Sequence, residues 1–328
     1  MIDLFVAVAG SGTGNRVMTS PDGIDWTTRS TPANNIWASL AWSPELGVLV
    51  ATALTGTGNR AMSTTDGINW TIRTTPAARQ WWGVTWSPEV GLFVSVGDFG
   101  SGEKVMTSPD GANWTSRIAV DNSWRAVCWS PELGLFAAVA TNAGAMTSPD
   151  GINWTARTTP VGEFWRDITW SPETGLFVAV TLGSSGSNNV MTSPDGINWT
   201  MRTGAASNQW LSVTWSPQLD LFAAISFDGT GNRVMTSPDG INWTSRVSAA
   251  DRPWAAITWS PPLGLFVAVA GVGSNDVMTS PDGITWTSRT GALDLDWRDV
   301  IWAGELTPPI PPDPQSFWTE RRRTTETI

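Results

Sequence analysis

The tryptophans recur in a sevenfold pattern, and this pattern constrains the fold more than any other feature. Of the 23 tryptophans, 21 form three sets of seven, and only Trp82 and Trp318 stand outside them. The sets are Trp26, Trp70, Trp114, Trp154, Trp199, Trp243 and Trp286; Trp37, Trp81, Trp124, Trp165, Trp210, Trp254 and Trp297; and Trp42, Trp86, Trp129, Trp170, Trp215, Trp259 and Trp302. A period of 40–45 residues marks a repeat architecture, in which each unit must pack against its neighbours to bury its apolar face.

One repeat, residues 165–202, predicts four short strands, named A to D. Residues 165–170 are β-branched and aromatic (strand A), and 176–180 form a continuous apolar run (strand B). Residues 190–193 (strand C) and 198–202 (strand D) flank a tight Pro-Asp-Gly turn. Four antiparallel strands repeated seven times predict an all-β fold, a seven-bladed β-propeller. An open solenoid would need capping repeats, and neither end resembles one.

The two ends of the repeat array complement each other. The chain begins with strands B, C and D over residues 4–29, and its last repeat stops after a strand A at 297–302. We therefore expect one blade built from both termini, which closes the ring and leaves no exposed sheet edge. The propeller is expected to span residues 1–302, and the Pro-rich segment 303–328 to be a C-terminal tail or linker that leads to a docking segment or a further domain.

Composition excludes several classes of function. The net charge is −10 with a single lysine, Lys104, which argues against a nucleic-acid partner. The chain has no histidine, which removes the commonest general base and zinc ligand, so no cofactor or metal is expected. The lone Cys128 excludes an intramolecular disulfide. The N-terminal residues lack the pattern of a signal peptide or a membrane span, so no membrane insertion is expected.

The repeated turn between strands C and D resembles the Asp-box, or BNR, repeat, which reads Ser-x-Asp-x-Gly-x-Thr-Trp in that family. The first copy matches at Ser20, Asp22, Gly23 and Trp26, although the turn is one residue shorter and Asn mostly replaces the Thr. The resemblance covers the seven turns and the blade layout. It implies that the Asp carboxylate binds turn amides while the Trp packs beneath, a structural role for Asp22, Asp66, Asp110, Asp150, Asp195, Asp239 and Asp282.

A ring of calcium-binding carboxylates is the alternative interpretation, and it is weak because the repeats do not gather carboxylates at ligand spacing. The Asp-box family includes sialidases and other glycosidases, a photosystem assembly factor and sorting receptors, so the fold does not select a function. For a sialidase the resemblance implies a Tyr nucleophile, and the chain has no tyrosine. Asp167 and Asp299 are the remaining acid–base candidates, but their blades stand three or four apart, and glycoside hydrolysis needs carboxylates roughly 5–10 Å apart. We therefore do not expect an enzyme.

The loops divide the expected disc into two unlike faces. Because strands alternate in direction, the nearly uniform A–B and C–D turns share one face, and the variable B–C and D–A loops share the other. Recognition sites are commonly built on variable loops of a rigid scaffold, although neutral drift would also make them diverge. Arg, Asn and Gln side chains suit sugar hydroxyls or carboxylates. The predicted ligand-binding residues are Asn15, Arg16, Asn34, Asn35, Asn59, Arg60, Arg79, Gln80, Trp82, Asn208, Gln209, Asn232, Arg233 and Arg252.

Trp82 stands at a strand-A position where the other repeats vary. Its equivalents are Ala38, Arg125, Arg166, Leu211, Ala255 and Arg298. The extra indole has two interpretations, a stacking platform for a ligand and a packing residue near the surface.

The sequence thus predicts a non-enzymatic propeller that recognises glycan or protein through its variable loops. Near-identical blades suggest recent internal amplification, which suits adhesion or virion-surface proteins. The alternative is an assembly or scaffold propeller for a protein complex, and a glycosidase of unfamiliar chemistry ranks third. Ligand and compartment are left open by the sequence.

Overall fold

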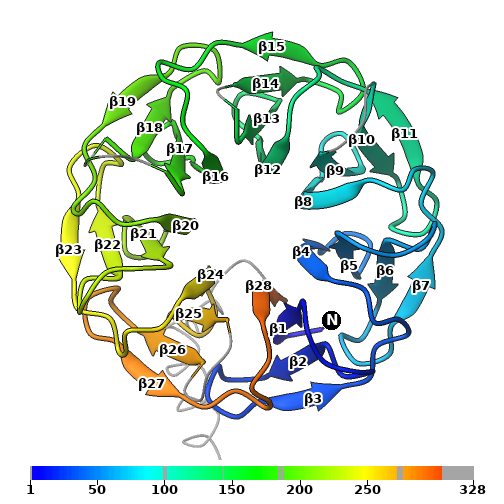
Figure 1. The fold of residues 1–328 in the computed structure, drawn as a ribbon, viewed down its shortest axis with the longest axis horizontal. Helices are drawn as coiled ribbons and strands as arrows, with labels where there is room; N and C mark the ends of the chain where they lie inside the picture. Colours follow the sequence, from blue (N-terminus) through cyan, green and yellow to red (C-terminus); the bar gives the residue numbers. More distant parts are fainter. Residues whose placement is uncertain are drawn as a thin grey trace, which may run out of the picture.

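Short antiparallel strands form seven four-stranded sheets, which radiate like blades around a central opening (Figure 1). The computed structural model describes residues 2–98, 102–142, 144–183, 186, 188–271 and 276–304. The predicted all-β propeller is confirmed. Of the predicted tail, residues 305–328 lie outside the described residues.

The blades are numbered here along the chain, each from its innermost strand A to its outermost strand D. Blade 1 holds β4 (Trp37–Ser43), β5 (Val48–Ala53), β6 (Ala61–Thr64) and β7 (Thr71–Arg73); blade 2 holds β8 (Gln80–Ser87), β9 (Leu92–Asp98), β10 (Glu103–Ser108) and β11 (Thr115–Ile118); blade 3 holds β12 (Trp124–Ser130), β13 (Leu135–Ala140), β14 (Ala145–Ser148) and β15 (Thr155–Arg157). Blade 4 holds β16 (Trp165–Ser171), β17 (Leu176–Thr181), β18 (Val190–Ser193) and β19 (Thr200–Arg202); blade 5 holds β20 (Trp210–Ser216), β21 (Leu221–Ser226), β22 (Val234–Ser237) and β23 (Thr244–Arg246); blade 6 holds β24 (Trp254–Ser260), β25 (Leu265–Ala270), β26 (Val277–Ser280) and β27 (Thr287–Arg289); blade 7 holds β28 (Trp297–Ala303), β1 (Leu4–Ala9), β2 (Val17–Ser20) and β3 (Thr27–Arg29).

Blade 7 is assembled from both ends of the described chain. Strand β28 pairs antiparallel with β1, in a register that sets Leu4 opposite Ala303 and Phe5 opposite Trp302. The predicted closure is confirmed, and every strand A is thereby paired to a strand B around the ring.

The second tryptophan set fills the space between consecutive blades. Trp37, Trp165 and their equivalents at the start of each strand A are at most 1% exposed. Around them lie seven clusters of buried apolar residues, each drawn from two neighbouring blades; Trp37, for example, packs with Val6 and Val8 of blade 7. Burying one indole removes about 150–250 Å² from water, which favours folding by roughly 4–6 kcal/mol before entropy is subtracted.

The other two sets have different contacts. In the third set, Trp170 donates Nε1–H to the Glu132 carboxylate of the preceding blade at 2.6 Å, and Trp215 donates likewise to Glu173 at 2.7 Å. These bonds link the A–B turns of adjacent blades. In the first set, Trp199 lies beneath its C–D turn and donates to the Gly196 carbonyl at 3.1 Å.

The C–D turns are held by their Asp side chains. Asp195 Oδ1 accepts hydrogen bonds from the amides of Ile197 at 2.8 Å and Asn198 at 2.7 Å, while the Asn198 side chain donates to Oδ2. This clamp extends the turn, so β19 begins at Thr200 rather than at the predicted residue 198. Asn198 therefore gives Asp195 both a backbone and a side-chain donor.

Ring closure can be tested by deleting residues 1–9. The deletion removes β1 and leaves β28 without its partner, so we expect a large loss in the free energy of unfolding, measured by chemical denaturation, or aggregation through the open edge. Adding a synthetic peptide of residues 1–9 should restore part of the lost stability. An unchanged denaturation midpoint for the truncated chain would contradict the closure.

The Asp195 clamp predicts a graded response to substitution. Asp195→Ala leaves two turn amides without their acceptor and should lower the free energy of unfolding by about 1–3 kcal/mol, whereas Asp195→Asn keeps one acceptor and should lose less. Burial alone would raise the pKa of Asp195, but hydrogen bonds from Asn198, Ile197 and Ser193 lower it to about 2. The stabilisation by the carboxylate is therefore present above about pH 4 and is lost as the pH falls toward 2. Equal melts for wild type and Asp195→Ala across that range would refute the clamp.

Candidate functional site: the channel mouth on the loop face

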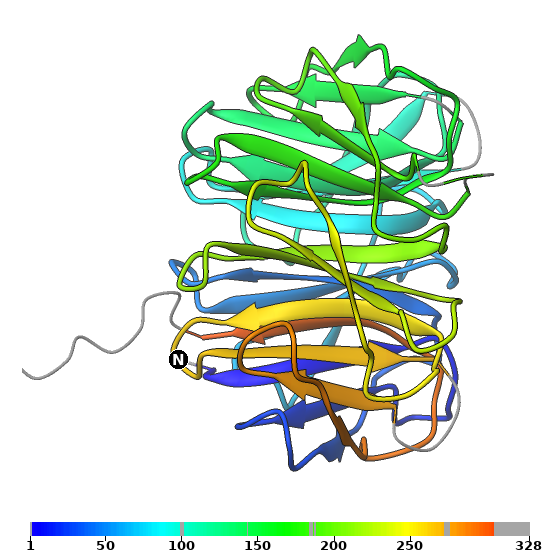
Figure 2. The same ribbon diagram turned by 90° about the vertical axis from the view of Figure 1, so that its left-hand side faces the viewer.

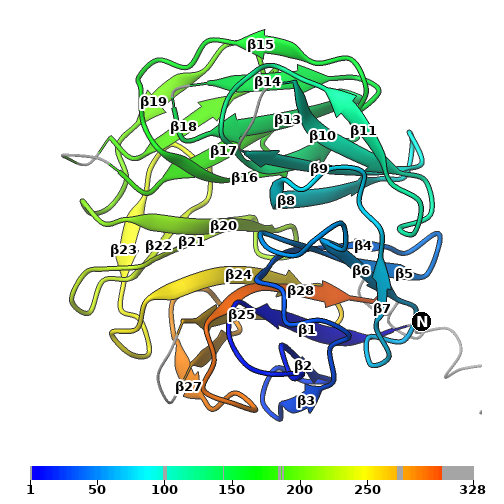
Figure 3. The ribbon, with the colours of Figure 1, turned by 45° about the vertical axis from the view of Figure 1, so that its right-hand side comes forward.

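The inner strands run through the thickness of the disc, from one face to the other, as the turned views show (Figures 2 and 3). Each strand A runs from the face of the B–C and D–A loops, called the loop face, toward the face of the A–B and C–D turns, called the turn face. The N-terminus lies at the turn face, because β1 is a strand B and begins there (Figure 2).

A β-bulge near the start of each strand A turns one residue toward the channel. In blade 4 the register with β17 shifts between Trp165 and Asp167, which leaves Arg166 unpaired in the ladder. The same shift occurs at every strand A, and bulges of this kind re-aim side chains. The seven bulge residues all line a channel cavity of ≈ 270 Å³: Ala38, Trp82, Arg125, Arg166, Leu211, Ala255 and Arg298.

Trp82 is fixed in place by two neighbours. Asp98, at the end of β9 and only 2% exposed, accepts a hydrogen bond from Trp82 Nε1 at 3.0 Å and forms an ion pair with Arg125 at 3.0 Å. The Arg125 guanidinium carbon lies 4.0 Å from the centroid of the Trp82 ring, and that of Arg166 lies 5.2 Å away. Both distances suit cation–π attraction, so Trp82, Arg125 and Arg166 form one cluster at the channel mouth.

The three bulge arginines differ in their partners. Arg125 pairs with Asp98, and Arg298 pairs with Asp296 at 2.8 Å. The Arg166 guanidinium makes no hydrogen bond or ion pair with any residue in the described part of the chain. Desolvation is the main cause that lowers the pKa of Arg166, to about 10, with Arg125 and Arg298 adding to it against the nearby aspartates. Arg166 is therefore still a cation at neutral pH.

Beside this cluster lies a second cavity of ≈ 400 Å³, called the mouth pocket, formed by blades 2 to 5. Its lining residues are Trp82, Arg125, Thr141, Phe164, Arg166, Leu182, Gly183 and Gln209. Phe164 is 54% exposed, an unusual state for a large aromatic side chain. Its ring lies against Gly183, where an added Cβ would come 2.7 Å from Phe164 Cδ2. The lack of a side chain at Gly183 therefore leaves room for the Phe164 ring, which forms one wall of the pocket.

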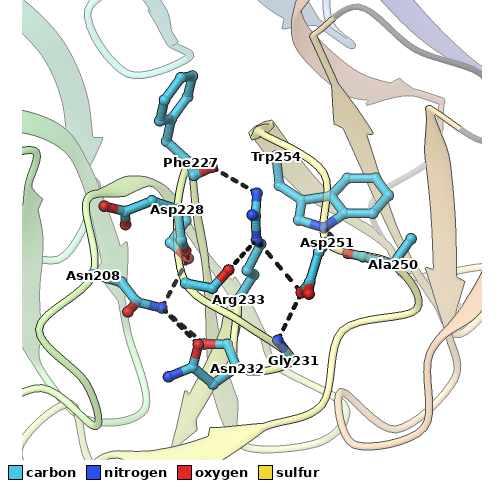
Figure 4. Close-up of polar contacts among 11 residues, drawn as sticks. Asn208, Phe227, Asp228, Gly231, Asn232, Arg233, Ala250, Asp251 and Trp254 are labelled. Carbon is cyan, nitrogen blue, oxygen red and sulfur yellow. Dashed lines mark hydrogen bonds and ion pairs between the residues drawn. The ribbon is translucent and has the colours of Figure 1, made fainter.

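The structure divides the predicted ligand-binding residues into those that line the mouth pocket and those that do not. Trp82 and Gln209 line the mouth pocket. Arg16, Arg60 and Arg233 instead fold back over their own B–C loops: Arg233 donates to the carbonyls of Gly229 at 2.8 Å and Phe227 at 2.7 Å, and lies 3.6 Å from Asp251 (Figure 4). Arg16 and Arg60 make the same pair of carbonyl contacts in their loops.

The predicted asparagines also make contacts within the loops. Asn208 donates to the carbonyl of Asn232 at 2.9 Å (Figure 4). Asn35 likewise donates to the carbonyl of Asn59 at 2.7 Å, so each asparagine ties a D–A loop to a B–C loop. Asn34 accepts from the Gly14 amide at 2.7 Å. In three loops the Asn side chain occupies the space beside a glycine with positive φ, namely Asn15, Asn59 and Asn232 beside Gly12, Gly56 and Gly229.

The other predicted residues, Arg79, Gln80 and Arg252, are half-buried on the loop face, and Gln80 opens β8 opposite Asp98. None of them lines the mouth pocket. Ligand binding by these three residues, and by the loop arginines and asparagines, stays a prediction.

Asp167 and Asp299 line the channel but serve as links between blades. Asp299 Oδ2 accepts the amide of Leu40 in blade 1 at 2.7 Å. Asp167 Oδ2 accepts the amide of Val213 in blade 5 at 3.0 Å and the hydroxyl of Ser212 at 2.8 Å. Each carboxylate thus holds the inner strand of the next blade, and the geometry gives both a structural contact. Within the described ranges no group of three or more acidic, Cys or His side chains could hold a metal ion, and no helix is long and apolar enough to cross a membrane.

Sequence reasoning missed Phe164, Asp98 and the two arginines as parts of the site. The comparison of repeats had already set Arg125 and Arg166 at the position of Trp82, so a signal existed. Position within the repeat could have identified them, because a bulge residue that varies between blades is not needed for packing.

Comparison with known proteins gives the fold. No family model and no curated protein matches the chain. Among solved structures, YCF48 bound to D1 peptide is similar with a TM-score of 0.58 at 18% identity, covering 79% of this chain and 82% of that one. Virginiamycin B lyase from Staphylococcus aureus has a TM-score of 0.65 at 12% identity over 79% and 86%. A chain of a nidogen/laminin complex has a TM-score of 0.56 at 9% identity over 91% and 97%. At these identities the likeness establishes a β-propeller and no family.

The link through Asp299 predicts a specific pH dependence. Burial raises the pKa of Asp299, the hydrogen bond from the Leu40 amide lowers it, and the negative charge of Asp167 raises it. The resulting pKa is about 7. An unfolded Asp ionises near pH 4, so this group's contribution to stability is full below pH 4, falls as the pH rises and levels off above 7. Asp299→Asn keeps an oxygen acceptor and removes the titration, so its free energy of unfolding should fall less than that of wild type between pH 4 and 7.

Urea denaturation at stepped pH measures this effect, with Asp25→Asn on the exposed turn as the matched loss of one carboxylate. Asp299→Ala also removes the acceptor for Leu40 and should cost about 1–3 kcal/mol at pH 5. Identical pH profiles for wild type and Asp299→Asn would show that Asp299 does not hold its proton in the folded state.

Proposed function

We propose that this propeller is a non-enzymatic recognition protein that binds a glycan or protein ligand at the channel mouth on the loop face. The observation that carries the proposal is the cluster of Trp82, Arg125 and Arg166 beside the mouth pocket. A concave, largely apolar pocket with a few convergent polar groups is the usual form of a binding site.

The asymmetry of the ring supports this proposal. Turn residues recur in nearly every blade, whereas the bulge position carries three arginines, one tryptophan, two alanines and one leucine. A residue needed only for the fold would be expected to repeat with the fold. Site-specific chemistry at one arc of the mouth instead suits a ligand that contacts blades 2 to 5.

A non-catalytic role is supported by the polar groups of the channel. Asp167 and Asp299 accept hydrogen bonds from neighbouring blades, and the chain has no histidine and no tyrosine. A catalytic pair must be free to exchange protons with a substrate. We also propose that the Ser-Pro-Asp-Gly turn is a shortened Asp-box, on the strength of the amide bonds to Asp195.

An assembly or scaffold role is the second candidate, and a specific observation favours it. Exposed apolar side chains lie at loop-face ends of strands and in loop-face loops, among them Ile118 at 77%, Val247 at 72% and Phe227 at 49% exposed. Exposed apolar side chains on the same face as the pocket favour a protein partner. The similar fold of YCF48, whose structure contains a D1 peptide, is consistent with a propeller that holds a protein segment.

Paired surface variants test which face binds. Trp82→Ala with Phe164→Ala changes the loop face, and Leu219→Ala with Ile241→Ala, both 38% exposed, changes the turn face. Each protein is applied to a glycan array and a peptide array, with thermal melts as the folding control. We expect hits of the wild type to weaken at least tenfold in the loop-face variant and to persist in the turn-face variant, because anchor residues dominate binding. Loss of binding only in the turn-face variant would assign recognition to the other face.

A further inference from the structure

The Arg166 side chain is the least compensated charge at the channel mouth. Its equivalents Arg125 and Arg298 each have an aspartate partner within 3.0 Å, and Arg166 has none among the described residues. A half-buried guanidinium without a partner is costly, because it loses part of its hydration and gains no ion pair. Such a group is ready to accept an anion from outside the chain.

Arg166 also lies at the junction of two spaces. It lines both the channel cavity of ≈ 270 Å³ and the mouth pocket of ≈ 400 Å³. Phe164, Leu182 and Trp82 give the mouth pocket an apolar wall. A ligand held by Arg166 would therefore place an apolar group directly beside its anionic group.

The charge of the mouth pocket indicates a monoanion. Its lining contains two arginines, Arg125 and Arg166, and no acidic residue, while Asp98 pairs with Arg125 from behind, so Arg166 is the one cation of the lining without an ion pair among the described residues. One uncompensated guanidinium matches one carboxylate, in the bidentate geometry that the two groups share.

The polar groups of the mouth pocket are too few for a sugar. Thr141 and Gln209 are its uncharged polar side chains, whereas a sugar ring presents hydroxyl groups on most carbons, and each needs a partner when buried. An apolar side chain on a peptide needs none. The lining thus favours a peptide segment over a carbohydrate.

We propose that the mouth pocket binds a peptide carboxylate that lies next to an apolar side chain. Arg166 holds the carboxylate, and the apolar side chain packs against Phe164, Leu182 and the edge of Trp82. This inference rests on the proposed recognition function and names the ligand class of that site. The carboxylate is either the end of a peptide or an acidic side chain, and both sources offer the same chemistry.

Short peptides measure the proposal directly, by calorimetry on the full chain. The probes are acetyl-Gly-Gly-Phe with a free carboxylate, the same peptide as its amide, and acetyl-Gly-Asp-Phe-Gly-amide, which carries only a side-chain carboxylate. We expect Kd on the order of 1 mM for at least one carboxylate peptide and at least tenfold weaker binding of the amide. Whichever carboxylate peptide binds more tightly identifies the source.

Variants at the bulge position separate this site from general charge effects. Arg166→Gln should remove the preference for carboxylate over amide, and Arg166→Lys, which keeps the charge and loses the planar fork, should weaken binding roughly three- to tenfold. Arg298→Gln is the matched control, because it lies at the same bulge position, is already paired with Asp296 and does not line the mouth pocket. It should bind as wild type does. Arg166 makes no hydrogen bond to the described chain and is partly desolvated, so Arg166→Gln should melt at the wild-type temperature or above it, which shows that lost binding is not lost folding.

Three results would overturn the proposal: no binding of either carboxylate peptide at 10 mM (about tenfold above the expected Kd), equal binding of acid and amide, or undiminished binding to Arg166→Gln. If one of these occurs while Trp82→Ala with Phe164→Ala still abolishes hits on the glycan or peptide arrays, the loop face binds another ligand and the recognition function survives. If that loop-face variant also leaves all array hits unchanged, the proposed function fails as well.

Discussion

The fold depends on one contact repeated around the ring, the indole that opens each strand A and is buried against the preceding blade. A four-stranded sheet of this size cannot cover its own apolar faces, so each blade is stable only between two others. In five blades the same indole also donates Nε1–H to the carbonyl four residues earlier, as from Trp124 to Val120 at 2.8 Å. In these five blades the D–A loop is thereby anchored to the buried indole, however the loop sequence varies.

The burial of the indole also accounts for the position of the candidate site. The residue after the buried indole is the bulge residue, which the ladder leaves unpaired and turns into the channel. Packing fixes Trp81 and Trp165 and leaves Trp82 and Arg166 free to differ. The bulge residue, which packing constrains least, thus follows directly after the indole that packing constrains most. The bulge side chains of several blades together line the channel mouth, which no single blade could form. The side chain can change at this position without disturbing the inter-blade core.

The architecture could be predicted from the sequence because several independent features indicate the same fold. Tryptophan spacing, the apolar strand B at 176–180 and the complementary ends together left one arrangement, and only the start of strand D was misplaced, since Asp195 extends the turn. The site was harder to predict. Arg16 and Arg233 suited a ligand by residue type, but their loop carbonyls satisfy the same donors. Which donors remain free depends on loop conformation, and a residue count along the chain does not carry that information.

The spread of stability around the ring explains how the fold tolerates a cation without an ion pair. The stability of the propeller is spread over seven inter-blade cores, and Arg166 belongs to none of them. Its desolvation is a local cost that the many buried indoles offset. The chain compensates such a charge elsewhere in the ring, because Asp296 forms an ion pair with the bulge residue Arg298. Among the described residues Arg166 has no equivalent partner, and Phe164 in the same pocket is exposed. A partly buried charge without an ion pair and an exposed aromatic ring both depart from the usual rules of folding, and such departures are expected to coincide where a ligand supplies the missing contacts.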